Sequence, residues 1–165
     1  MRLWGETCLA EFLGDSVVWR NLEPADPRLP GLGAAWREMG LEGPRVPRKA
    51  ELGYARAIVH LLREAQVLQA PGTALARLLY VGDTRLLDGT AYANLLRVGG
   101  WPGLAFIAGE RLAEPPRLVR EGSVFLANRW ALLGDFLGQA EREGLPLGPG
   151  TALVLDLDKT TFGAR

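Results

Sequence analysis

The chain has 165 residues, 48% of them hydrophobic, and a formal net charge of zero, a composition that excludes an intrinsically disordered chain. The balanced charge and the lack of a basic block argue against nucleic-acid and membrane partners. Cys8 is the only cysteine, which excludes an internal disulfide, and we expect a cytoplasmic protein because no secretory or transmembrane pattern is present.

The first 47 residues are predicted to form a helical and irregular layer packed around the main domain. Short helices are expected over Leu3–Leu13 and Ala34–Met39, where apolar residues share a face. The proline-rich segment 23–30 between them can be neither a helix nor a central strand. We therefore predict two parts, the layer at 1–47 and an α/β domain at 48–165.

From Lys49 onward, helical and strand patterns alternate. A helix is predicted first, with one buried face formed by Ala55, Ile58, Leu62 and Ala65. A buried strand at 78–81 follows, then a helix from about Asp88 to Val98 that Gly99 and Gly100 end. A second buried strand is expected over Gly103–Ala108.

The last third of the domain is predicted to contain one long helix and one strand. Ser123 is a suitable helix N-cap. The residues after it place an apolar stripe on one helix face, at Leu126, Trp130, Leu133, Leu137 and Ala140. Gly144 ends this helix, and the apolar run 153–155 makes the third strand.

This alternation predicts a doubly wound, Rossmann-like parallel sheet of at least three strands with helices on both faces. We expect strand 103–108 on one side of strand 78–81, and strand 152–155 on the other. Because both crossovers must be right-handed, their helices then cover opposite faces of the sheet. A crevice opens beyond the carboxyl end of the central strand.

Carboxylates follow two of these strands directly. Asp83 and Asp88 come after the first strand, and Asp156 and Asp158 come after the third. For each strand taken alone, a structural explanation is as good as a metal site: acids often cap the loop after a parallel strand, and Asp88 is also a suitable helix N-cap. Carboxylates converging from two adjacent strands repel each other and need either a cation or a raised pKa. A hard divalent ion held by one or two carboxylates and several waters is the simplest answer, so we predict a Mg²⁺ site.

The same residues resemble motifs of the haloacid-dehalogenase superfamily. The run Asp156-Leu157-Asp158-Lys159-Thr160 after an apolar strand is similar to its first motif, DxDx(T/V). Gly82-Asp83 with Asp88 resembles the fourth motif, and Lys49 resembles the third-motif lysine. The resemblance spans Lys49 to the C-terminus. The motifs occur in circularly permuted order, and no segment matches the second-motif Ser or Thr or the flap.

This resemblance implies Mg²⁺-dependent phosphoryl transfer on a phosphorylated small molecule. Asp156 would be the nucleophile that forms an aspartyl-phosphate, and Asp158 the general acid and base. Thr160 would fix the turn after the strand, and Lys49 would neutralise charge on the phosphoryl group and restrain Asp156. The resemblance implies a metal-ligand set of Asp83, Asp88, Asp156 and Asp158.

Other interpretations remain open at this stage. The chain would be a fragment of a longer permuted protein, or would be completed by self-association at its open sheet edge. A non-catalytic α/β module that keeps the fold and binds metal or serves in assembly is the alternative. A response-regulator-like domain also gathers acids at strand ends, but the DxDKT spacing favours the phosphatase class over it.

Overall fold

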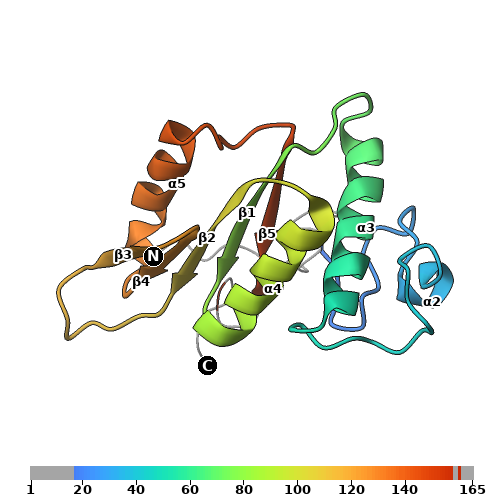
Figure 1. Ribbon diagram of the computed structural model, residues 1–165, viewed down its shortest axis with the longest axis horizontal. Coiled ribbons are helices and arrows are strands. Elements are labelled where there is room, and N and C mark those ends of the chain that lie inside the picture. The colour runs from blue at the N-terminus through green and yellow to red at the C-terminus, as the bar shows by residue number, and fades with distance from the viewer. Residues whose placement is uncertain (1–16, 158–159, 161–165) are drawn as a thin grey trace, which may run out of the picture.

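The computed structural model describes residues 17–157 and Thr160. Figure 1 shows a sheet with helices packed against it. The helices are α2 (Leu32–Ala35), α3 (Leu52–Gln69), α4 (Arg85–Gly99) and α5 (Leu133–Arg142), with a short 3₁₀ turn at Trp130–Leu132. The strands are β1 (Arg77–Gly82), β2 (Gly103–Ala108), β3 (Leu118–Glu121), β4 (Val124–Ala127) and β5 (Thr151–Leu155).

The five strands form one sheet in the order β3-β4-β2-β1-β5. β4, β2, β1 and β5 are parallel, and β3 runs antiparallel to β4 at one edge. The central strand β1 has β2 on one side and β5 on the other, as predicted. The α/β fold and the arrangement around the central strand are therefore confirmed.

The sheet carries a hydrophobic core on each face because side chains alternate along its buried strands. Leu78 and Tyr80 of β1 face a core shared with α3 and α4. Leu79 and Val81 face the opposite core, where Phe136 of α5 is fully buried. In Figure 1, α3 and α4 lie side by side and α5 stands apart from them. The predicted placement of helices on both faces is thus correct.

The helix predicted to begin after Ser123 is wrong in its first half. Val124–Ala127 is the strand β4, which pairs with both β2 and β3, and the helix α5 begins only at Leu133. A short apolar run is compatible with either a strand or a buried helix, and periodicity alone does not separate them. Gly122 has a φ of +61°, and it forms the turn of the β3–β4 hairpin, which the sequence analysis missed.

Smaller differences concern the other helices. α4 begins at Arg85, with Thr84 at its N-cap position, so Asp88 lies inside the first turn and is not the N-cap. α2 covers Leu32–Ala35, which shifts and shortens the helix expected at Ala34–Met39. The helix expected at Leu3–Leu13 lies outside the described residues.

The described residues before α3 are largely irregular apart from the short helix α2. Leu22, Leu32, Ala35 and Met39 of this part of the chain are buried against the helix α3. Between Val17 and Leu157, no helix has both the length and the hydropathy that crossing a lipid bilayer requires.

Candidate functional site

The register of the sheet brings Asp83 and Asp156 to the same edge. Val81 of β1 pairs with Leu155 of β5, so the two strands end at the same level. The Asp156 backbone N–H continues this pairing and donates to the Val81 carbonyl at 3.0 Å. Asp83 directly follows Gly82, the last residue of β1. The carboxyl ends of two adjacent parallel strands therefore deliver these acids to one place, as the sequence predicted.

Asp88 reaches this place from the first turn of α4. Its Oδ2 atom accepts hydrogen bonds from the backbone N–H groups of Asp83 at 3.0 Å and Thr84 at 2.7 Å. These amides belong to the turn that joins β1 to α4, so the Asp88 side chain closes that turn from within. Gly82 leaves room for it, since a Cβ atom there would lie 2.7 Å from Asp88 Oδ2.

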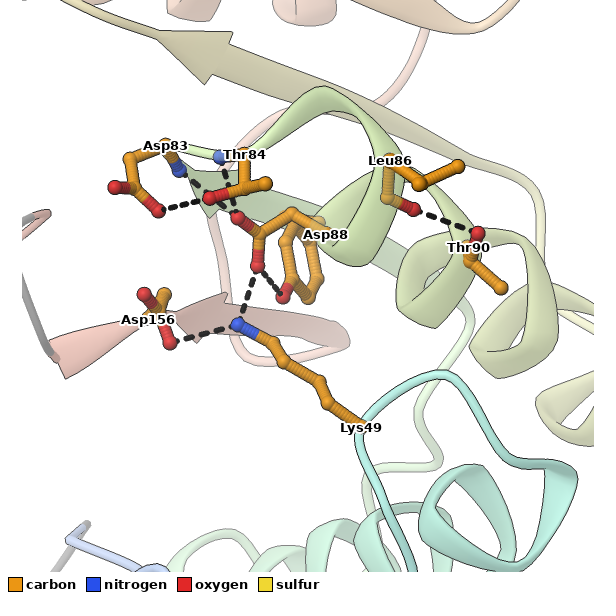
Figure 2. A network of polar contacts seen from close by, with 8 residues as sticks. Lys49, Asp83, Thr84, Leu86, Asp88, Thr90 and Asp156 are labelled. Atoms are coloured by element: carbon orange, nitrogen blue, oxygen red, sulfur yellow. Dashed lines mark hydrogen bonds and ion pairs between the residues drawn. The ribbon is translucent and has the colours of Figure 1, made fainter.

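Lys49 joins the two acidic segments. Its ammonium group forms an ion pair with Asp88 Oδ1 and a second one, at 2.7 Å, with Asp156 Oδ1 (Figure 2). Lys49 lies 107 positions before Asp156 in the chain. The Asn94 side chain of α4 donates to the carbonyl of the adjacent Ala50 at 3.0 Å and so ties the lysine segment to the helix.

Tyr80 is a member of the site that the sequence analysis treated only as part of a buried strand. Its hydroxyl donates to Asp88 Oδ1 at 2.7 Å, and the side chain is 1% exposed. Tyr80 lies on the sheet face that α4 covers, so strand alternation and the predicted crossover could have placed it near the start of that helix.

Burial and the lysine together set the protonation of the site. Burial raises the pKa of Asp88, but the hydrogen bonds from Lys49, Tyr80 and Thr84 outweigh it and hold this pKa below its ordinary value. Burial also raises the pKa of Asp156, and Lys49 only partly offsets it, so this pKa stays above the ordinary value. Burial lowers the pKa of Lys49, but its hydrogen bonds to Asp156 and Asp88 raise it more.

Oxygen atoms from three aspartates, Asp83, Asp88 and Asp156, all lie within 4.8 Å of one another. In an octahedral Mg²⁺ site, adjacent ligands are about 3.0 Å apart and opposite ligands about 4.2 Å, so the aspartate oxygens would have to move closer together to share one ion. With Lys49 included, the ionised groups carry two net negative charges, the complement of one divalent ion. The cluster could therefore hold a metal ion, and carboxylate oxygen suits hard cations such as Mg²⁺.

The remaining predicted site residues follow β5. Asp158 and Lys159 lie outside the described residues, so the expected roles of Asp158 as general acid and metal ligand stay predictions. Thr160 is described, and its hydroxyl oxygen is buried without a hydrogen-bond partner among the residues that the structure covers. The role of Thr160 in fixing the turn after β5 stays a prediction.

No protein-family model matches this chain, and no match was found among curated proteins or solved structures. The comparisons therefore identify no family, haloacid-dehalogenase or other. The fold and the site together establish an α/β domain with a mostly parallel five-stranded sheet and three aspartates that could bind a metal ion.

Proposed function

We propose that this domain catalyses Mg²⁺-dependent phosphoryl transfer from a small phosphomonoester, with Asp156 as the nucleophile. The proposal follows the resemblance of the motifs to the haloacid-dehalogenase superfamily. In this proposal Asp83 and Asp156 bind the ion, whose chemistry is to neutralise charge on the transferring phosphoryl group.

The observation that carries the proposal is the double ion pair of Lys49. One ammonium group holds Asp156, after β5, and Asp88, beyond β1, in a single half-buried position. A structural ion pair needs only one acid, and acids that only cap loops need no lysine from a distant segment. A cation beside the proposed nucleophile restrains the carboxylate and adds positive charge where phosphoryl oxygens would lie.

The chemistry assigned to the chain balances in two steps. A carboxylate oxygen of Asp156 attacks phosphorus, the bond from phosphorus to the leaving oxygen breaks, and Asp158 gives that oxygen a proton. Asp158 then takes a proton from water, the water oxygen attacks phosphorus, and the bond to Asp156 breaks. The products are an alcohol and inorganic phosphate, and both carboxyl groups return to their starting states.

The test is hydrolysis of p-nitrophenyl phosphate with and without Mg²⁺. Asp156→Asn should lower kcat by about 10³-fold or more, since the amide is a poor nucleophile. Asp135→Asn is the matched control: this exposed aspartate of α5 lies outside the acidic cluster, and its substitution should leave kcat unchanged. Equal rates for the wild-type protein and Asp156→Asn would refute the proposed catalysis.

A second function, a non-catalytic assembly module, is favoured by a different observation. β5 is an edge strand of the described sheet, it contains no charged residue or proline, and its Leu153 and Leu155 are each 41% exposed. Natural edge strands usually carry charged residues or proline, which prevent pairing with a strand of another chain. Sedimentation that shows self-association, abolished by Leu155→Lys, together with no phosphatase turnover would favour this function over catalysis.

A further inference from the structure

The Asp88 carboxylate is almost fully buried and is enclosed by donor groups. An ionised carboxylate offers about four acceptor positions. Asp88 receives four donors: the Tyr80 hydroxyl and the Lys49 ammonium on Oδ1, and two backbone N–H groups on Oδ2. Its side chain is only 1% exposed. A metal ion could bond Asp88 only by displacing a donor from a buried position.

Asp83 and Asp156 are more accessible to an ion that arrives with its water shell. Asp83 is half-buried, and its Oδ1 accepts from the Thr84 hydroxyl at 2.9 Å. Asp156 is 23% exposed. In Figure 2 both carboxyl groups lie on the same side of the Asp88 side chain, away from the helix that carries Leu86 and Thr90. Mg²⁺ keeps several of its waters, so two carboxylates at a solvent-accessible position suit it.

Tyr80 holds Asp88 in this arrangement. It extends from the central strand, whose backbone is fixed by pairing with β2 and β5, and its hydroxyl donates to the Oδ1 atom that also meets Lys49. The Lys49 ammonium lies 5.9 Å from the centre of the Tyr80 ring, so the ring also faces the cation. The two side chains that position Lys49 thus lie on regular elements, Tyr80 on β1 and Asp88 on α4.

We propose that Tyr80 and Asp88 are positioning residues: Tyr80 fixes the Asp88 carboxylate, which orients Lys49 toward Asp156 and shapes the turn carrying Asp83, while Asp88 stays outside the metal's coordination sphere. This inference rests on the proposed function in taking the cluster as a metal site. It narrows the ligand set expected from the sequence, since Asp88 acts on the ion only through its neighbours.

Tyr80→Phe tests the hydroxyl with little change in volume. With p-nitrophenyl phosphate and Mg²⁺, kcat should fall about five-fold or more while KM stays within about two-fold, because Lys49 is misplaced but the metal ligands remain. Tyr92→Phe is the matched control: this buried tyrosine lies 6.2 Å from Tyr80, ring to ring, and makes no hydrogen bond to Asp88. A kcat within two-fold of wild type for Tyr80→Phe, or an equal loss in Tyr92→Phe, overturns the positioning role.

A crystal structure of the wild-type protein with Mn²⁺ tests the ligand assignment without relying on turnover. The inference expects the ion bonded to Asp83 and Asp156, with Asp88 still accepting from Tyr80 and the two turn amides. A bond from Asp88 to the ion would overturn the inference alone. No ion in the cluster would overturn both the inference and the proposed function. A bound ion without phosphatase turnover would refute only the proposed catalysis.

Discussion

Replacing Lys49 with methionine tests whether a single cation holds the site together. The substitution keeps an apolar stem of similar length and removes the charge between Asp88 and Asp156, which are 1% and 23% exposed. It leaves two carboxylates near each other with no cation, whereas Asp88 keeps its other three donors.

The magnitude follows from the geometry. Unit charges 2.7 Å apart attract by about 6 kcal/mol at an effective dielectric constant of ~20. Most of this offsets the cost of removing Lys49 and the acids from water. Because the lysine is 24% exposed, we expect a net loss of about 2–3 kcal/mol in the free energy of unfolding, at or just below the range of about 3–5 kcal/mol for breaking a buried pair. For a chain of this size, the melting temperature should fall by roughly 4–12 °C.

The pH dependence separates lost charge from lost packing. Without the lysine, the pKa values of both carboxyl groups should rise in the folded protein. A raised folded pKa means that the folded state binds more protons than the unfolded chain, so stability falls as pH rises past the ordinary value of 3.8. The stability difference between wild type and Lys49→Met should therefore be larger at pH 7 than at pH 4. A packing defect would be equally large at both.

Urea denaturation of both proteins at pH 4 and pH 7 measures this difference. Arg45→Met is the matched control, because Arg45 belongs to the same segment and forms an exposed ion pair with Glu51. Such surface pairs contribute about 0–1 kcal/mol. A loss below about 0.5 kcal/mol for Lys49→Met at pH 7, or an equal loss at pH 4 and pH 7, would show that the lysine charge does not stabilise the site.

Two further predictions concern the turn around Asp88 and the lysine itself. Gly82→Ala should destabilise the fold by about 1–3 kcal/mol, because the added Cβ would overlap the Asp88 side chain. The control Gly89→Ala, where the Cβ would lie in open space on α4, should stabilise the fold by up to about 1 kcal/mol. Equal effects of the two substitutions in thermal denaturation would contradict this prediction. The raised pKa of Lys49 stabilises the fold fully below the ordinary value of 10.5, and this contribution is lost as pH rises through the folded pKa. Denaturation between pH 9 and 12 should show a steeper loss of stability for wild type than for Lys49→Met, and identical slopes would count against the ion pair.

The main features of the fold could be predicted from sequence because they depend on short-range patterns. The runs at 78–81 and 103–108 are apolar throughout because these strands are covered on both faces, and the apolar run 153–155 marks the edge strand β5. The expected order β2-β1-β5 is the one found in the sheet, and right-handed crossovers within that order place helices on both faces. The β3–β4 hairpin was missed because Val124–Ala127 is too short for its period to be read, and only pairing with β2 decides that it is a strand.

Within the candidate site, the amino-acid order alone shows which acids follow which strands, and this predicts that Asp83 and Asp156 share one edge of the sheet. The burial of Asp88 under four donors, one of them Tyr80, and the reach of Lys49 to both acidic segments became visible only in the folded chain. The physical reason is distance along the chain. A strand pattern fixes the direction of its own side chains, but contacts across 107 residues depend on strand register and on how α3 and α4 dock on the sheet.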